Sequence, residues 1–241
     1  MTDLSQLKIK VFADGADLAS IKEHVGNPIV KGFTTNPSLM RNAGVSDYKS
    51  FALSASKLVA GKPISFEVFS DDADEMVKQG QEIASWNDNI NVKIPVINTE
   101  GKSTISAIQS LSRDGITVNV TAIFTRDQYE RVIDAVSEKH PSIISIFAGR
   151  IADSGIDPTE TMRAAVEYAK SKPKAEILWA STREPHSIIQ AEACGCQIIT
   201  VERSILDKAC QLFGKNLQQY SVETVKRFYD DAMSSGFSIP I

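Results

Sequence analysis

Short runs rich in apolar and β-branched residues alternate with helical patterns along the whole chain, and this alternation restricts the possible folds most. The runs read KIKVFAD, IVKGFTT, PISFEVF, INVKIPV, TVNVTAIF, SIISIFAG, AEILWAS and QIITVE. Eight strands that alternate with helices over 241 residues match an α/β fold of the (β/α)8 class, the TIM barrel. A doubly wound open sheet would give a similar pattern, but no G-x-G-x-x-G follows the first run, and polar residues recur near the ends of the runs. We therefore expect a barrel.

The gaps between the runs carry signals for the start of helices. Asp17 is placed to cap the segment LASIKEHV, and Thr125 with Gln128 forms a capping box for RDQYERVIDAV. In the segment DPTE, Pro158 stands where the first residue of a helix is expected. Helices are therefore expected between the strands, as the barrel requires.

The C-terminal segment departs from this alternation. No linker, long repeat or low-complexity tract interrupts the chain, so we expect one barrel domain over residues 1–241, with residues 215–241 as a C-terminal helix and tail. The helical pattern SVETVKRFYDDAMSS precedes the apolar tail GFSIPI. Because an exposed apolar tail is a liability, we expect it to dock on its own barrel or on a neighbouring subunit of a homo-oligomer.

Composition argues against several classes of protein. The formal net charge of −4 provides no basic surface for nucleic acid. A hydrophobic content of 42% with 23% charged residues is ordinary for a soluble globular protein, and no apolar run suits a signal peptide or a membrane span. We therefore expect a cytoplasmic protein that binds neither nucleic acid nor membranes.

The cysteines and histidines indicate neither a disulfide framework nor a metal site. Cys194, Cys196 and Cys210 are odd in number and cluster late in the chain, which fits reduced thiols in a protein core. The three histidines stand far apart and form no metal-binding motif. We expect no metal, which weighs against a zinc-dependent aldolase.

Lys93 places a charge inside the buried run NINVKIPV. An unpaired ammonium there loses its hydration, which favours the neutral amine, the form that attacks carbonyl carbons. The alternative is a lysine on an edge strand whose amine reaches water or pairs with a carboxylate. Polar residues on the other strands decide between the two.

Such residues recur at the C-terminal ends of the strands, where alternate side chains point inward and catalytic groups of barrels gather. Seven runs carry them: Asp14; Thr34, Thr35 and Asn36; Glu67; Lys93; Asn119 and Thr121; Ser145 and Phe147; and Ser181 with Arg183. Their coincidence at one end of seven strands favours a site over scattered structural roles.

Each of these residues also has a structural alternative. A single strand-end Asp or Asn is most often a helix cap or a turn former. Glu67 can serve only as the ion partner of Lys93, and Asn119 and Thr121 can satisfy each other in the core. The arginines of FAGRIADSG and STREP, Arg150 and Arg183, can be solvated loop charges.

Taken together, these residue types suit one reaction. A neutral lysine attacks a ketone to give a carbinolamine, which loses water to become an iminium that accepts the electrons of the adjacent C–C bond as it breaks. Asp14 is placed to take the proton from the hydroxyl at that bond, while Glu67 and Thr121 hold a water that transfers protons. Two arginines with Ser181 at the mouth offer forked donors for a phosphate. The implied ligand is a sugar phosphate.

The ordered motifs resemble the transaldolase family. FADGAD, GFTTNPS, SFEVF, VKIPV, VNVTAIF, SIFAGR and WASTR cover nearly the whole barrel, and TTNPS with VKIP is specific to that family and to the related small fructose-6-phosphate aldolases. The resemblance implies a Schiff-base lysine at Lys93, an acid/base at Asp14, and a catalytic water positioned by Glu67 and Thr121. It implies substrate contacts by Asn36, Thr34, Asn119, Ser145 and Phe147, with phosphate bound by Arg150, Ser181 and Arg183.

Two positions separate the relatives, because the simple aldolases typically carry Gln where this chain has Glu67 and Tyr where it has Phe147. A tyrosine hydroxyl can order the water that protonates the enamine and releases a free ketone, whereas Phe147 cannot donate a proton. The resemblance thus implies a cofactor-free transaldolase of the pentose phosphate pathway. The alternatives are a fructose-6-phosphate aldolase, and a barrel that binds sugar phosphates without breaking carbon bonds.

Overall fold

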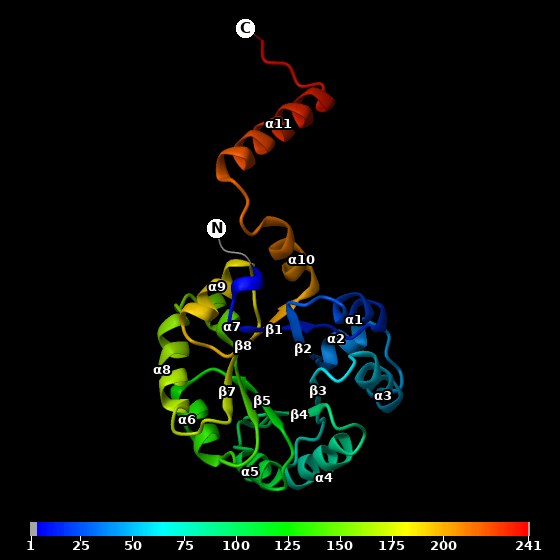
Figure 1. The fold of residues 1–241 in the computed structure, drawn as a ribbon, viewed down its shortest axis with the longest axis vertical. Coiled ribbons are helices and arrows are strands. Elements are labelled where there is room, and N and C mark those ends of the chain that lie inside the picture. Colours follow the sequence, from blue (N-terminus) through cyan, green and yellow to red (C-terminus); the bar gives the residue numbers. More distant parts are fainter. Residues whose placement is uncertain (1–3, 241) are drawn as a thin grey trace.

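Eight parallel strands close into a barrel in which the neighbours follow chain order from β1 to β8 (Figure 1). The computed structural model describes residues 4–240; residues 1–3 and Ile241, the last residue of the predicted tail, lie outside that range. The strands are β1 (Lys10–Asp14), β2 (Val30–Thr34), β3 (Ile64–Glu67), β4 (Ile90–Pro95), β5 (Val118–Ile123), β6 (Ser142–Ile146), β7 (Ala175–Trp179) and β8 (Ile198–Glu202). Each of the eight runs forms one strand, so the predicted (β/α)8 barrel is confirmed.

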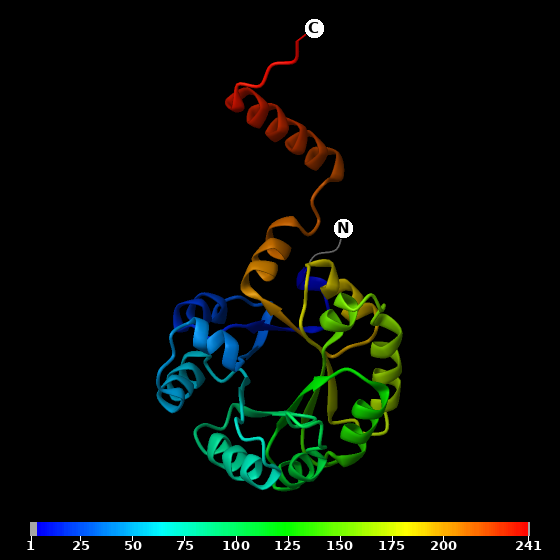
Figure 2. The same cartoon turned by 180° about the vertical axis from the view of Figure 1, so that it is seen from behind.

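Helices fill the connections and surround the strands, as the view from behind also shows (Figure 2). After the short 3-10 helix η1 (Leu4–Gln6) come α1 (Leu18–Val25), α2 (Pro37–Asn42), α3 (Tyr48–Leu58), α4 (Ala73–Ala84), α5 (Ile105–Arg113), α6 (Arg126–Ala135), α7 (Ala148–Asp153), α8 (Thr159–Ala169), α9 (His186–Ala193), α10 (Arg203–Leu212) and α11 (Leu217–Ser235). No helix among residues 4–240 combines the length and the apolar character needed to cross a bilayer.

The predicted helix caps are confirmed with one shift. Asp17 accepts a hydrogen bond from the Ser20 amide at 2.7 Å, and Thr125 forms the expected capping box. Pro158 is the N-cap of α8 rather than its first helical residue. The Asp157 side chain accepts a hydrogen bond from the Thr159 amide, which starts the first turn one residue later.

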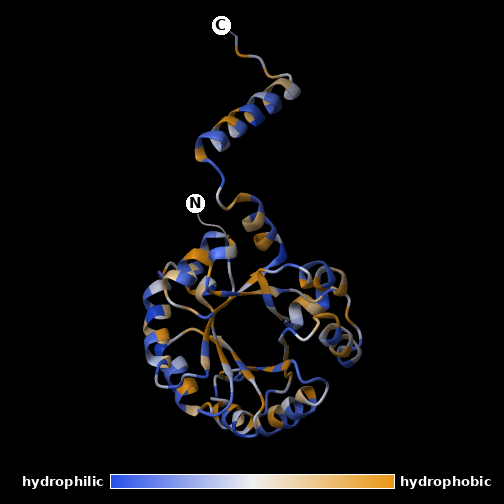
Figure 3. Ribbon diagram, viewed as in Figure 1, coloured by the Kyte–Doolittle hydropathy of each residue, from blue (hydrophilic) through white to orange (hydrophobic). Residues whose placement is uncertain are grey.

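The main apolar core lies between the barrel and its helices. Val92 and Ile94 on β4 are fully buried in this core, and burial of each contributes about 1.5–3 kcal/mol. Helices cover the outer face of the strands, and apolar residues predominate along them (Figure 3). Cys194 and Cys196 are buried as predicted, whereas Cys210 is exposed and the prediction of a core thiol is wrong there.

The inside of the barrel is apolar towards the N-terminal ends of the strands and polar at their C-terminal ends. Phe12, Ile143, Leu178 and Ile198 form a separate small cluster. Phe12, Ile143 and Ile198 each stand two residues before a polar, cavity-lining position on the same strand, such as Asp14 after Phe12. Because alternate residues of a strand point to the same side, the cluster forms a floor, and the polar residues above it face the open end.

Helix α11 and the residues after it project away from the barrel (Figures 1 and 2). None of its residues is buried, and Asn216 caps it, so it begins earlier than predicted. Helix α10 already packs beside β8 and β1, which closes the ring of helices. Large apolar side chains are exposed along the projecting segment at Leu217, Val222, Val225, Phe228, Tyr229, Met233, Phe237 and Ile239. Docking of the tail on its own barrel is therefore wrong for the described residues, and docking on a neighbouring subunit stays a prediction.

Candidate active site

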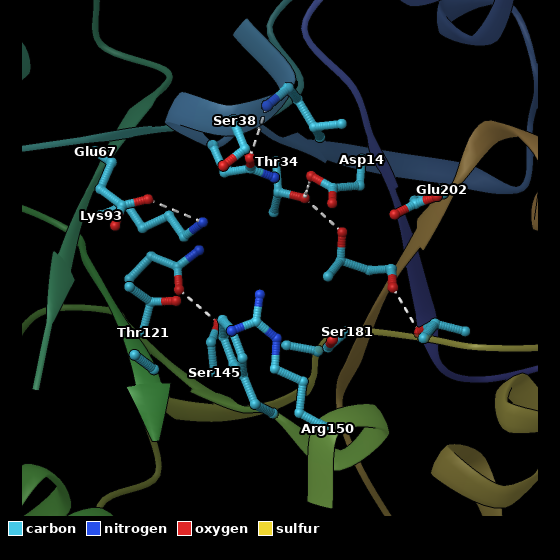
Figure 4. Close-up of a pocket in the computed structure, with 18 of the residues that line it drawn as sticks. Asp14, Thr34, Ser38, Glu67, Lys93, Thr121, Ser145, Arg150, Ser181 and Glu202 are labelled. Atoms are coloured by element: carbon cyan, nitrogen blue, oxygen red, sulfur yellow. Dashed lines mark hydrogen bonds and ion pairs between the residues drawn. The ribbon is translucent and has the colours of Figure 1, made fainter. Parts of the chain in front are cut away.

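The C-terminal ends of the strands surround a cavity of about 430 Å³ (Figure 4). It is lined by every predicted site residue: Lys93, Asp14, Glu67, Thr121, Asn36, Thr34, Asn119, Ser145, Phe147, Arg150, Ser181 and Arg183. Thr35 does not line it, because its side chain is buried and donates to the Ser65 carbonyl. The structure thus brings the predicted residues together, while their individual roles stay predictions.

Lys93 is both buried and paired. Its side chain lies on β4 between Glu67 on β3 and Asn119 on β5, which are its direct partners in the sheet register. Lys93 is 9% exposed, its Nζ lies 3.2 Å from Glu67 Oε2, and it donates a hydrogen bond to the Thr35 carbonyl at 3.0 Å. The expectation of an unpaired ammonium is therefore wrong, and a carboxylate stands ready to accept a proton from the amine (Figure 4).

Asp14 reaches the same cavity from β1. Thr34, its register partner on β2, donates a hydrogen bond to Asp14 Oδ1 at 2.8 Å, and the hydroxyls of Thr34 and Thr200 are 2.5 Å apart. Burial raises the pKa of Asp14 above its ordinary value, against the opposing effects of Lys93 and of the Thr34 hydrogen bond. A carboxyl group with a raised pKa suits proton transfer near neutral pH.

Asn119 and Ser145 form a hydrogen-bonded network on the cavity wall. The Asn119 amide donates to Ser65 Oγ at 3.0 Å, and Ser145 Oγ donates to Asn119 Oδ1 at 2.6 Å. The alternative that Asn119 and Thr121 satisfy each other is therefore wrong. Within residues 4–240, the buried Thr121 hydroxyl has no hydrogen-bond partner, although it lines the cavity. This hydroxyl is available to a water or a ligand.

Asn36 combines a structural role with its place in the cavity. Its Oδ1 accepts a hydrogen bond from the Leu39 amide at 2.9 Å and so caps α2. The helix-cap alternative is therefore confirmed for this residue. Its side-chain NH2 group remains to donate to a ligand, because the cap uses only the oxygen.

The two arginines differ in how free they are. The Arg150 guanidinium lies 5.2 Å from the centre of the Phe147 ring, which holds it by a cation–π contact. Arg183 instead binds Asp153 through Nε, at 3.0 and 3.1 Å, and through Nη2, at 2.5 Å. Its fork is thus already occupied by a carboxylate, which corrects the expectation that both arginines offer free forked donors. The hydrogen bond from Arg183 also lowers the pKa of Asp153.

An unusually close backbone approach shapes the cavity wall at Ser181. Ser181 has φ of 62°, a conformation that non-glycine residues seldom adopt. A Cβ atom at Gly149 would lie 1.6 Å from the Ser181 carbonyl oxygen, so only glycine fits there. The Gly149 amide donates to the Ala180 carbonyl at 3.2 Å, which joins α7 to the end of β7.

Sequence reasoning missed several residues in or beside the cavity, and three of them carry or pair charges or hydroxyls discussed here: Thr200, Glu202 and Asp153. Thr200 and Glu202, on β8, line it at alternate positions of the strand. The strand-end rule used for the other seven strands would have identified both. Asp153 follows Arg150 by three residues on α7, and nothing in the sequence indicated its pairing with Arg183. In the described part of the chain, no group of three or more His, Cys, Asp or Glu side chains is arranged to hold a metal ion.

Comparisons with known proteins identify the family of this chain. The sequence model of the Transaldolase/Fructose-6-phosphate aldolase family matches residues 11–239. The chain is 36% identical over 202 residues to a probable transaldolase of Roseiflexus castenholzii, a match that covers 83% of this chain and 89% of the relative. It is 33% identical over 232 residues to a probable transaldolase of a Thermoanaerobacter species, covering 96% of this chain and 100% of that one.

Solved structures with low sequence identity share the barrel. KGPDC from Streptococcus mutans superposes with a TM-score of 0.58 at 13% identity, covering 86% of this chain and 93% of that chain. N-acetylneuraminate lyase from Mycoplasma synoviae gives a TM-score of 0.50 at 14% identity, covering 97% and 85%. These two likenesses show the fold alone. The family match over almost the entire chain shows more: this protein belongs to the transaldolase/fructose-6-phosphate aldolase family and is an enzyme of the transaldolase and aldolase type.

Proposed function

We propose that this protein is a cofactor-free transaldolase. It transfers a dihydroxyacetone unit from sedoheptulose 7-phosphate or fructose 6-phosphate to an aldose phosphate such as erythrose 4-phosphate or glyceraldehyde 3-phosphate. The observation that carries the proposal is the buried Lys93 amine, which faces the cavity beside Glu67. Asp14 lines the same cavity as a separate carboxyl group with a raised pKa.

The first half of the reaction forms and uses a Schiff base at Lys93. Glu67 accepts a proton from the ammonium, and the neutral amine attacks the C2 carbonyl of the ketose to form a carbinolamine. Loss of water, assisted by a water held at Glu67 and Thr121, gives the iminium. Asp14 then takes the proton of the C4 hydroxyl as the C3–C4 bond breaks. The electrons of that bond pass to the iminium nitrogen. The aldose phosphate leaves, and an enamine remains on Lys93.

The second half depends on what the enamine meets. Attack on an acceptor aldehyde, with a proton returned by Asp14, makes the new ketose, and hydrolysis of its iminium frees the enzyme. Phe147 lines the cavity, packs 5.6 Å from Phe124 between ring centres and carries no hydroxyl. It therefore cannot order a water that protonates the enamine, which favours transfer over release of dihydroxyacetone.

Measuring release against transfer tests this function. With fructose 6-phosphate alone, free dihydroxyacetone is expected to appear slowly. Addition of erythrose 4-phosphate is expected to give rapid formation of sedoheptulose 7-phosphate and glyceraldehyde 3-phosphate. Both products are measured by chromatography. Rapid release without acceptor would instead identify a fructose-6-phosphate aldolase, the other activity in the family's name. Binding of the sugar phosphate without either product would identify a non-catalytic barrel.

We further infer a cytoplasmic homo-oligomer that acts in the pentose phosphate pathway, from the sugar-phosphate substrates and the projecting apolar segment. The exposed Phe237 and Ile239 need a cover that their own barrel does not supply. Deletion of residues 236–241 is expected to reduce the particle mass measured by light scattering after size-exclusion chromatography. The matched control replaces the exposed Ser238 with alanine and is expected to leave the mass unchanged. An unchanged mass for the deletion would show that the tail holds no assembly together.

A further inference from the structure

The charged side chains around the cavity do not give it the net positive charge that would attract a phosphate. Three acidic and three basic side chains line it: Asp14, Glu67 and Glu202 against Lys93, Arg150 and Arg183. Their formal charges cancel. Asp153 adds a further negative charge directly on Arg183. A doubly charged phosphate therefore enters a cavity without net positive charge.

Glu202 contributes to this balance without any part in the chemistry proposed above. It is the last residue of β8 and the direct register partner of Asp14 on β1, so both side chains point to the same side of the sheet (Figure 4). Within residues 4–240, no hydrogen bond or ion pair joins its carboxylate to another group. The next residue, Arg203, does not neutralise it, because its guanidinium pairs with Glu23 at 2.5 Å and with Asp207 at 3.5 Å.

Glu202 also acts on the phosphate end of the cavity. The pKa of Arg183 is raised first by its hydrogen bond with Asp153 and in addition by the charge of Glu202. Asp153 thus acts on the Arg183 guanidinium by direct hydrogen bonding, and Glu202 acts on it as a further charge on the wall of the same cavity. Of the two arginines on the wall, Arg150 alone has no carboxylate partner among the described residues. A phosphate here meets one free guanidinium, one occupied guanidinium and the unpaired charge of Glu202.

We propose that Glu202 determines which aldehydes the enzyme accepts. Its negative charge weakens the binding of phosphate-bearing aldehydes, and neutral polyhydroxy aldehydes consequently compete with them for the enamine. The proposal rests on the transaldolase function given above and adds a preference among acceptors to it. Glu202 acts through charge at the rim and is a specificity-determining residue.

The test compares Glu202→Gln with the wild-type enzyme for one charged and one neutral acceptor. The KM for glyceraldehyde 3-phosphate divided by the KM for glyceraldehyde is expected to fall about threefold to tenfold, because one repelling charge is removed near a dianion. The dissociation constant of inorganic phosphate, measured by calorimetry without any turnover, is expected to fall by a similar factor. Both effects are expected to shrink at high salt.

Glu184→Gln is the matched control. It also removes one negative charge, but from an exposed residue in the loop after β7 that does not line the cavity. It is expected to leave the KM ratio and phosphate binding as in the wild type. An equal effect of both variants would show a general effect of net charge and overturn the role of Glu202, as would unchanged phosphate binding in Glu202→Gln.

The two readouts separate this proposal from the proposed function. If transfer activity is absent from the wild type, the function fails, and phosphate titration still tests the effect of Glu202. If transfer proceeds normally but the KM ratio and the phosphate affinity do not change in Glu202→Gln, only the specificity role fails.

Discussion

Lys93→Met is expected to abolish transfer, with kcat reduced by at least about 10³-fold, because no other lysine among the described residues lines the cavity to form the Schiff base. Methionine keeps most of the volume of the lysine side chain, so the strand packing is retained. The variant leaves Glu67 without its partner. Removing one partner of a fully buried ion pair costs about 3–5 kcal/mol of unfolding free energy. The loss in this variant is expected to be smaller, because Glu67 faces the cavity. Circular dichroism and steady-state assays check both expectations.

Trapping the intermediate identifies the nucleophile directly. Borohydride added with fructose 6-phosphate is expected to attach a three-carbon adduct to Lys93 in the wild type, as located by peptide mass spectrometry. Lys62 serves as the internal control, because desolvation lowers its pKa, yet it stands before β3 at the opposite end of the barrel. An adduct on Lys62, or persistent activity of Lys93→Met, would contradict the proposed mechanism.

Asp14→Asn is expected to reduce kcat by about 10²- to 10⁴-fold, the usual contribution of a general acid–base group. Asparagine keeps an oxygen that accepts the hydrogen bond of Thr34, but it cannot take the proton of the C4 hydroxyl. In the wild type, kcat/KM is expected to fall as the pH drops through the raised pKa of Asp14, above the range of an ordinary aspartate. A pH profile of kcat/KM measured for both proteins checks this acidic fall in activity.

The same substitution is expected to raise stability at neutral pH. The pKa of Asp14 is higher in the folded than in the unfolded chain, mainly through desolvation, so the folded state binds the proton more tightly. The ionised carboxylate therefore destabilises the fold as the pH rises through the folded pKa, and this cost disappears below the unfolded pKa. Melting temperatures should favour Asp14→Asn at pH 7 and converge as the pH falls through the acidic range.

Asp17→Asn provides the matched control for both effects. Asp17 caps α1 three residues away, and asparagine caps helices as well as aspartate does. Its activity and melting temperature are expected to stay near those of the wild type. Equal losses of activity in Asp14→Asn and Asp17→Asn would contradict the acid–base role proposed for Asp14.

The strands were predictable because burial on two faces leaves a simple mark in the sequence. On β4, Val92 and Ile94 face the helices while Lys93 faces the inside, so a single charge in an apolar run located both the strand and the site. The same alternation on β8 pointed to Thr200 and Glu202. They were missed because the strand-end rule was applied to the other seven runs only, although the last residue of this run, Glu202, is the register partner of Asp14.

Pairings that depend on the placement of helices were not predictable. Arg183 and Asp153 come from different connections, and only the path of α7 brings them together. The place of α11 was equally hidden, because exposed residues such as Phe228 and Met233 indicate that a face needs a cover without indicating which surface supplies it. Local signals such as the Asp17 cap were reliable, since they involve neighbours in the chain.

The contact between Gly149 and the Ser181 carbonyl limits how this enzyme can evolve new substrate preferences. It locks the loop after β6 and the loop after β7 into one block, so neither can be displaced alone to accommodate a larger or differently shaped ligand. Natural variation in ligand choice should therefore accumulate by exchange of side chains at unconstrained rim positions, while the glycine itself stays invariant wherever the block is kept.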